Sequence, residues 1–173
     1  MSQQSSLSFT SSIYSSLLVR DVAGSYRPAE PAEVLQAALR VLEGQLRGTE
    51  MLSSPQAVRD FLRIKLGTLE HEVFAVIHLD AQHRVIEYVE MFRGTVTQTS
   101  VYPREVVKEA MAHNTAAIVL VHNHPSGVAE PSRADEHLTQ TLRSALSLVD
   151  VRVIDHLIVA GPTILSFAER GLI

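Results

Sequence analysis

Apolar residues in the first third of the chain recur at helical spacing. A stripe from Leu35 to Leu46 follows a proline-rich, acidic start and is closed by Gly48, a typical helix end. A second stripe follows Ser54-Pro55, a pair that commonly opens a helix. The spacing predicts two amphipathic helices whose apolar faces pack into a core.

Further along, apolar residues run continuously or alternate with polar ones, as in strands. Four stretches have this character: residues 71–80, 85–92, 116–121 and 151–160. The first two predict a hairpin, and residues 96–102 a more polar strand or an extended loop. The stretch 116–121 is wholly apolar, which predicts a strand buried on both faces. Residues 151–160 predict a last central strand, after which the chain turns into a short ending at 164–167.

Helical patterns separate these strands. One helix is expected to open at Pro103, and another at Ser132, whose apolar stripe includes Leu138 and Leu142. The order of elements predicts an α/β sandwich in which helices flank a mixed sheet.

Residues 1–28 are rich in serine and glutamine and have few large apolar groups. Such a tail buries too little surface to offset its ordering entropy, so we expect it to be disordered or to dock on a partner. Residues 29–53 are then the N-terminal helix and its connection, and residues 54–173 the principal domain.

Composition narrows the function classes. The chain is 46% hydrophobic and 20% charged, as in ordinary globular proteins. Its net charge of -4 provides no excess of positive charge for binding nucleic acid. It has no cysteine, which excludes disulfides. No basic start precedes an apolar run of signal-peptide length, and Leu17-Leu18-Val19 is too short to span a bilayer. We expect a cytoplasmic protein with no membrane contact.

Candidate metal-binding residues follow the end of the apolar strand, in the segment His122-Asn123-His124-Pro125-Ser126-Gly127. Residues two apart in a strand project to the same side, so His122 and His124 converge while Asn123 faces away. Asp135 lies one helical turn before Leu138, on the inward stripe, where an isolated carboxylate is costly unless it is paired or binds a metal. Two imidazoles, one carboxylate and a free fourth position match a catalytic zinc site.

Simpler interpretations exist for each residue alone. A single histidine is more often hydrogen-bonded than a ligand, and Ser132 with Asp135 forms the pattern of a capping box. The conjunction of strand end, paired histidines, turn and inward aspartate favours the metal.

These residues also carry a resemblance to a family. H-x-H-P, a spacer of seven residues and S-x-x-D resemble the JAMM signature of JAB/MPN+ zinc metalloproteases. Four segments resemble the RadC-like branch of this family: HNHPSG, PSRAD, YPREVVKEA and VRVIDHLIVAG. The resemblance implies a JAB1/MPN-like (cytidine-deaminase-like) fold, zinc bound by His122, His124 and Asp135, and Ser132 as the stabiliser of an oxyanion.

The resemblance also implies a glutamate general base just before the first core strand. Of Glu70, Glu72, Glu87 and Glu90, it selects Glu72, whose alternation lets its carboxylate enter the site; a solvated strand-end glutamate is the alternative. His156 follows Asp155 in an Asp-His pair that recurs in the family pattern. It is expected either to support the site from behind the candidate ligands or to be a satisfied core histidine.

The remaining histidines are expected at the surface or in packing: His71, His78, His83, His113 and His137.

Taken together, these features predict a zinc hydrolase that cleaves an amide bond in a peptide or protein conjugate, that is, a metallopeptidase or isopeptidase. A small-molecule amide substrate stays open, as do homo-oligomerisation and a non-catalytic interaction module that keeps its metal. A zinc deaminase is disfavoured because its H-x-E and P-C-x-x-C ligands are absent. The resemblance brings a DNA-repair label, but the chain looks like a short form without a helix-hairpin-helix region, and its composition does not support direct DNA binding.

Overall fold

The computed structural model describes residues 17–47, 55–95 and 100–173. The chain divides into two units, residues 1–41 and 42–173. Among the described residues, no helix is long and apolar enough to cross a membrane.

The first unit contains a small hairpin that corrects the expectation of a disordered tail. Strands β1 (Leu18–Arg20) and β2 (Tyr26–Pro28) pair in an antiparallel manner. The turn between them is held by the Asp21 carboxylate, which accepts hydrogen bonds of 2.9 Å from the amides of Ala23 and Ser25, a local bond that offsets part of the ordering entropy. The expectation of disorder is therefore wrong for residues 17–28, whereas docking on a partner stays a prediction, and residues 1–16 lie outside the described residues.

Helix α2 (Pro31–Leu46) follows the hairpin, as the apolar stripe predicts. The Glu33 carboxylate in its first turn pairs with Arg27 at 2.7 Å and accepts a hydrogen bond from the amide of Glu30 at 2.9 Å. A negative charge at this end suits the helix dipole.

The second unit is built on a five-stranded mixed sheet with the order β4-β3-β5-β6-β7. Its strands are β3 (Val73–Leu79), β4 (Val85–Arg93), β5 (Ala117–Asn123), β6 (Arg152–Ala160) and β7 (Thr163–Ser166). Only β5 and β6 are parallel, and they are joined through a helix, as a parallel pair requires. β5 is central, and every one of its residues is buried, as its apolar run predicts.

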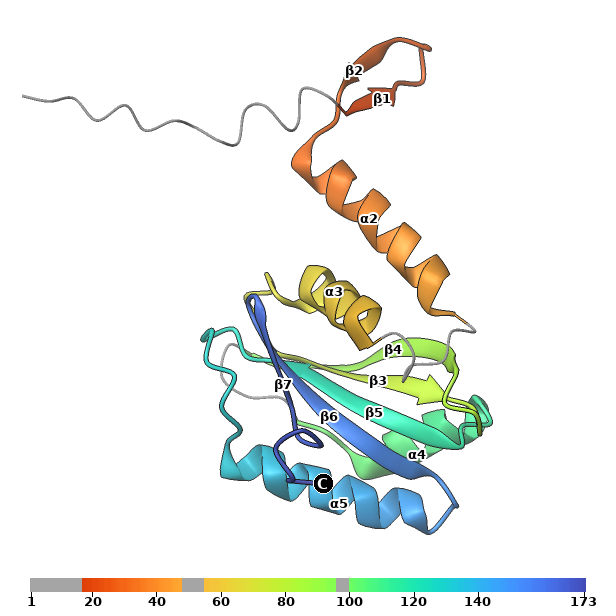
Figure 1. Ribbon diagram of the computed structural model, residues 1–173, viewed down its shortest axis with the longest axis vertical. Helices are drawn as coiled ribbons and strands as arrows, with labels where there is room; N and C mark the ends of the chain where they lie inside the picture. Colours follow the sequence, from red (N-terminus) through yellow and green to blue (C-terminus); the bar gives the residue numbers. More distant parts are fainter. Residues whose placement is uncertain (1–16, 48–54, 96–99) are drawn as a thin grey trace, which may run out of the picture. The chain divides into compact units, whose positions relative to one another are not determined.

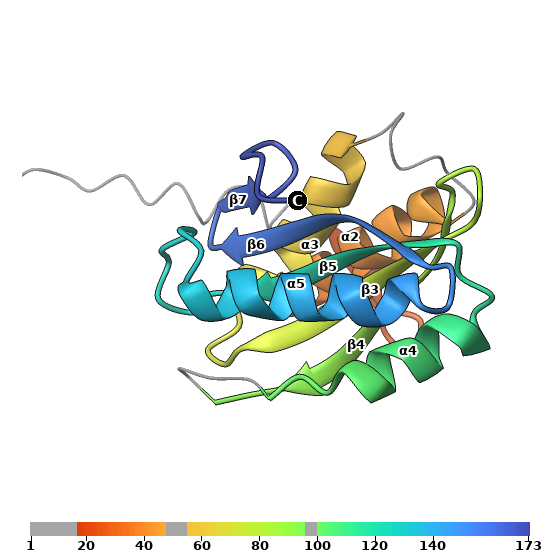
Figure 2. The ribbon, with the colours of Figure 1, turned by 90° about the horizontal axis from the view of Figure 1, so that it is seen from below.

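Helices cover both faces of this sheet (Figures 1 and 2). α4 (Pro103–Ala112) and α5 (Arg133–Ser147) lie on one face, where Phe74, Val76, Ile118 and Leu120 of the sheet pack against helix residues such as Leu142. α3 (Pro55–Leu66) covers the other face and buries Phe61 and Leu62. The predicted α/β sandwich and these three helices are confirmed.

One detail differs from the expectations. The ending at 164–167 begins as a fifth strand, β7, which pairs with β6 from Leu157↔Ser166 to Ala160↔Thr163, because the turn at Gly161, with φ of 55°, returns the chain along the sheet edge. Residues 100–102 form no strand, in agreement with the extended loop that was the other expectation for this segment, and residues 96–99 lie outside the described part of the chain.

The buried histidine of β3 makes stability depend on pH. His78 is fully buried, its Nδ1 lies 2.9 Å from Thr115 Oγ1 and its ring stacks on His113 at 4.5 Å. Burial, and secondarily the charge of His113, lowers the pKa of His78 to about 4. The unfolded chain takes up this proton near pH 6.5, before the folded protein does. We expect a contribution that is complete above pH 6.5 and is lost between pH 6.5 and 4, up to about 3 kcal/mol.

Urea unfolding at several pH values checks this. The His78→Leu variant should lose less stability than the wild type over that interval. Parallel losses in the two proteins would show that another group is responsible.

Candidate metal centre

Strand β5 brings two histidines to one point at its carboxyl end. His122 lies on the same face as Ile118 and Leu120, opposite Phe74 of β3, and is 2% exposed. His124 follows the strand, and its amide donates to the carbonyl of Val159 at 2.8 Å. The Nε2 atoms of the two histidines are 2.9 Å apart, so the predicted convergence is present.

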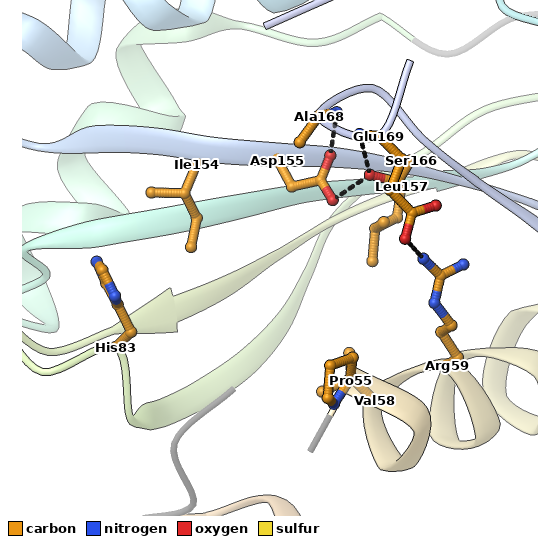
Figure 3. A pocket seen from close by; sticks show the side chains of 10 residues that line it. All are labelled: Pro55, Val58, Arg59, His83, Ile154, Asp155, Leu157, Ser166, Ala168 and Glu169. Atoms are coloured by element: carbon orange, nitrogen blue, oxygen red, sulfur yellow. Dashed lines mark hydrogen bonds and ion pairs between the residues drawn. The ribbon is translucent and has the colours of Figure 1, made fainter. Parts of the chain in front are cut away.

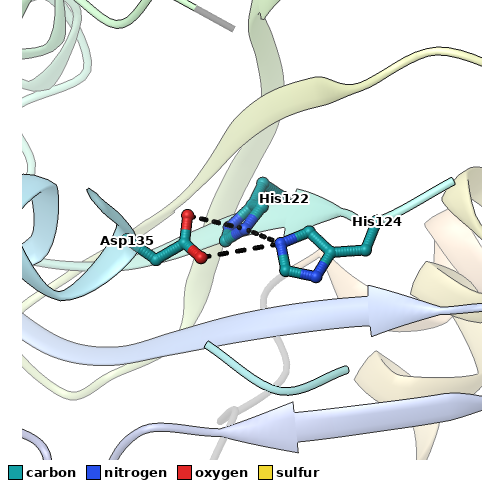
Figure 4. A group of neighbouring side chains, drawn as sticks. All are labelled: His122, His124 and Asp135. Atoms are coloured by element: carbon teal, nitrogen blue, oxygen red, sulfur yellow. Dashed lines mark hydrogen bonds and ion pairs between the residues drawn. The ribbon is translucent and has the colours of Figure 1, made fainter. Parts of the chain in front are cut away.

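Asp135 reaches the same point from the first turn of α5. Its Oδ1 is 3.3 Å from His122 Nε2, and its Oδ2 is 3.6 Å from His124 Nε2 (Figure 4). Its Oδ2 also accepts from the amide of Ser132 at 2.7 Å, while its own amide donates to Ser132 Oγ at 3.2 Å. The capping box and the convergence on the histidines are both present, because the cap orients the carboxylate toward β5.

This group of three has the chemistry of a metal site. Ligand atoms of His122, His124 and Asp135 all lie within 4.8 Å of one another, an arrangement that no other group of His, Asp and Glu in the described ranges shows. Two ring nitrogens that face each other at 2.9 Å beside a carboxylate favour a cation at the point where they converge. The three residues therefore fit a bound metal ion.

Charge at the site favours the same conclusion. Burial opposes ionisation of Asp135, but hydrogen bonds with His122 and His124 outweigh it and hold the pKa of this carboxyl well below its usual range. The hydrogen bond to Asp135 in turn raises the pKa of His124, against the effect of burial. An ionised carboxylate beside two imidazoles is a donor set that suits zinc.

Ser132 is already engaged in the cap. Its hydroxyl donates to Asp135 Oδ2 at 2.7 Å. To donate to an oxyanion, as the family resemblance implies, this hydroxyl must turn away from Asp135.

Glu72 lies immediately before β3, on the rim of the same cluster. Its amide donates to the carbonyl of Thr95 at 2.9 Å, and its carbonyl accepts from Gly94 at 2.8 Å, which fixes its backbone at the end of the β3–β4 pair. Burial raises the pKa of the Glu72 carboxyl, while His122 and His124 are near enough to oppose this shift. A carboxyl with a raised pKa, near the candidate ligands but not among them, has the chemistry of a candidate general base.

The other carboxylates considered from the sequence lie elsewhere. Glu87 pairs with Arg47 at 2.5 Å and Glu90 with Lys65 at 3.4 Å, both on β4 at the far edge of the sheet. Glu70 is exposed, two residues before Glu72.

Asn123 has a structural role that the sequence pattern does not reveal. Its side chain faces away from the histidines, and its Oδ1 accepts from the amide of Val73 at 2.8 Å while its Nδ2 donates to the carbonyl of His71 at 3.0 Å. These two peptide groups flank Glu72. The residue between the ligands therefore fixes the backbone of Glu72 from the neighbouring strand.

The Asn123→Ala variant should be less stable by about 2–3 kcal/mol, because it leaves two backbone groups near the buried end of β3 without their partner. Urea unfolding of the metal-free protein measures this. Ser144→Ala, which removes only an exposed hydroxyl bonded within α5, serves as the control and should change stability by no more than about 0.5 kcal/mol. An equally small effect at Asn123 would contradict its anchoring of the strand.

His156 lies directly behind the ligands, within β6. It is fully buried, and its Nε2 is 2.8 Å from His122 Nδ1. Burial lowers the pKa of His156 well below its ordinary value, so its ring is neutral. Its sequence neighbour Asp155 points to the opposite face of the sheet, where its carboxylate accepts from Ser166 Oγ at 2.6 Å and from the amide of Ala168 at 3.0 Å.

That opposite face carries a separate pocket between α3, β6 and the segment after β7 (Figure 3). Its volume is about 360 Å³, and Pro55, Val58 and Leu157 are among its lining residues. An ion pair of 2.5 Å joins Arg59 and Glu169 at its wall. None of the predicted ligands, nor Glu72 or Ser132, lines this pocket.

Comparison with known proteins agrees with the geometry. Residues 52–172 match the model of the RadC-like JAB domain. The chain belongs to this family. It is 61% identical to a UPF0758 protein of Leptothrix cholodnii and 59% identical to one of Methylibium petroleiphilum, in each case over 150 residues that cover 87% of this chain and 68% of the relative. A UPF0758 protein of Nitrosomonas eutropha is 56% identical over 150 residues, 87% of this chain and 67% of the relative. The predicted family is thereby confirmed, and the mixed sheet flanked by helices is consistent with a JAB/MPN fold.

Proposed function

We propose that this RadC-like JAB domain is a zinc-dependent hydrolase that cleaves an amide bond. The observation that carries the proposal is the convergence of His122, His124 and Asp135 on one point beside the Glu72 carboxylate. Two imidazoles and one carboxylate leave a coordination position for a reacting group, as in catalytic and unlike structural zinc sites.

A zinc ion held by these three residues would act as a Lewis acid and lower the pKa of a coordinated water toward about 7. Glu72 would accept a proton from the attacking water and return it to the leaving amine. Its raised pKa suits this exchange because proton transfer is most efficient when the pKa of the base lies near the working pH.

Ser132 has two tasks in this proposal. Its hydroxyl and amide orient the Asp135 carboxylate when no substrate is bound. When a carbonyl approaches, the hydroxyl turns and donates to the developing oxyanion. The amide of Ser132 keeps its bond to Asp135 Oδ2 throughout, so the ligand stays oriented.

The proposed substrate is a peptide or a protein conjugate joined through a peptide or isopeptide bond. Support comes from the family and from the pairing of the metal group with a separate carboxylate base. A small-molecule amide meets the same chemical requirements and is distinguished by the substrate screen.

We expect about one zinc ion per chain after chelation and reconstitution, measured by elemental analysis. Absence of stoichiometric metal after reconstitution would overturn the proposal. The reconstituted protein is then screened against peptide, isopeptide and small-molecule amide libraries, with zinc-loaded Glu72→Gln as the inactive reference. Zinc binding without hydrolysis in every library would favour a non-catalytic interaction module.

A further inference from the structure

A buried chain of hydrogen bonds leads from one candidate ligand to the backbone of another. His122 Nδ1 lies 2.8 Å from His156 Nε2, and His156 Nδ1 lies 2.6 Å from Thr139 Oγ1. The Thr139 hydroxyl is in turn 2.7 Å from the carbonyl oxygen of Asp135, one helical turn earlier in α5. This series of hydrogen bonds therefore joins β5, β6 and α5 behind the candidate metal ligands.

Water has almost no access to the side chains in this series of hydrogen bonds. The exposed fractions of His122, His156 and Thr139 are 2%, 0% and 2%. Buried polar groups of this kind depend on their protein partners for hydrogen bonds, because no solvent replaces a lost one. The position of each proton is thus set within the chain.

The last acceptor in this series of hydrogen bonds, the Asp135 carbonyl oxygen, determines which atom donates in each of them. A carbonyl oxygen only accepts, so the single proton of the Thr139 hydroxyl is donated to Asp135, and Thr139 Oγ1 accepts from His156 Nδ1–H. A neutral imidazole has one donor and one acceptor. His156 Nε2 therefore accepts from His122 Nδ1–H, and the lone pair of His122 is on Nε2.

That lone pair faces His124 and Asp135, where a metal ion would bind. The second histidine reaches the same state by a shorter route, because His124 Nδ1 donates directly to the carbonyl oxygen of Val128 at 2.7 Å. Among the residues that the structure describes, His122 Nδ1 has no such direct carbonyl partner. Its tautomer depends on the relay through His156.

We propose that Thr139 is a positioning residue that sets, through His156, the tautomer in which His122 offers its Nε2 lone pair to a metal. The proposal rests on the proposed metal site. It assigns a function to a polar residue within the apolar inward stripe of α5, next to Leu138 and one turn before Leu142.

Two substitutions at Thr139 distinguish the effect of its hydroxyl group from the effect of its side-chain shape. Thr139→Val replaces the hydroxyl with a methyl group of similar size, while Thr139→Ser keeps the hydroxyl. Without the acceptor, His156 avoids a buried unpaired N–H by moving its proton to Nε2, since an unpaired buried donor is rarer than an unpaired acceptor. It then donates to His122 Nδ1 and leaves a proton on His122 Nε2.

The first measurement is zinc affinity by competition with a chelator. Thr139→Val should bind zinc about 10–100-fold more weakly than the wild type, the usual effect of removing a group that orients a ligand. Thr139→Ser should stay within about 3-fold of the wild type, because its hydroxyl makes the same bonds.

The second measurement is the tautomer of His122 in the metal-free protein, by long-range ¹H–¹⁵N NMR at alkaline pH. We expect the Nδ1–H form in the wild type and in Thr139→Ser, and the Nε2–H form in Thr139→Val. This readout does not depend on catalysis or on zinc, so it decides the inference even where the wild type fails to bind zinc and the proposed function is lost.

An Nε2–H tautomer in the wild type, or an unchanged tautomer in Thr139→Val, would overturn the inference. Unchanged zinc affinity in Thr139→Val, in a wild type that binds zinc, would also overturn it. A lower melting temperature of Thr139→Val with both readouts unchanged would assign Thr139 to packing alone.

Discussion

The Glu72→Gln variant should retain zinc with near wild-type affinity and lose hydrolytic rate by about 10²–10⁴-fold, the usual share of general acid–base catalysis. Glutamine keeps the size of the side chain and its hydrogen-bonding reach, but it cannot take a proton from water. Steady-state rates on a substrate found in the screen, together with elemental analysis of the same preparation, measure both quantities.

Glu70→Gln is the matched control, because Glu70 is an exposed carboxylate two residues away. This variant should have nearly the same zinc affinity and hydrolytic rate as the wild type. If Glu70→Gln were the inactive variant, the assignment of the base would be wrong by two residues; if neither variant mattered, the base would lie elsewhere.

The Asp135→Asn variant should lose zinc affinity by more than about 10²-fold, a larger effect than that of removing a group that only orients a ligand. The asparagine carbonyl can replace Oδ2 in the bond from the Ser132 amide, so the helix cap is kept. Its NH₂ group then occupies the position of Oδ1, 3.3 Å from His122 Nε2, where it donates to the lone pair that the metal needs. Chelator competition measures the affinity, and thermal melting of the metal-free protein should change little.

Asp150→Asn offers a control with the same chemical change outside the site. Asp150 has a φ of 59°, a conformation that asparagine also tolerates. Its zinc affinity should equal that of the wild type. Normal zinc binding with a much lower melting temperature in Asp135→Asn would mean that Asp135 serves only as the cap.

Much of the second unit follows from local pattern. The wholly apolar stretch before His122 becomes the fully buried β5, because a strand covered by helices on both faces has no polar side. The two-residue period of that strand places His122 and His124 together, and the spacing of Ser132 and Asp135 produces the capping box at the start of α5. These relations act over a few residues, so the sequence alone predicts them.

Local pattern failed at residues 17–28, where the serine-rich composition of the tail concealed a hairpin. The Asp21 side chain stabilises its turn through two backbone amides, an interaction of a single residue that average composition does not reveal. The boundaries of the predicted domains stay predictions.

The sequence by itself determined the order of helices and strands in residues 55–173 apart from β7, the candidate ligands, and the pairing of His122 with His124, because each depends on side-chain periodicity within one element or one turn. Only the tertiary structure decided that Asn123 anchors the backbone on both sides of Glu72 and that Thr139 and His156 lie behind His122. The physical reason is that these contacts depend on strand register and on the seating of α5 against the sheet. They join residues that are between 17 and 52 positions apart, and no periodicity along the chain encodes which buried polar atoms will meet at that range.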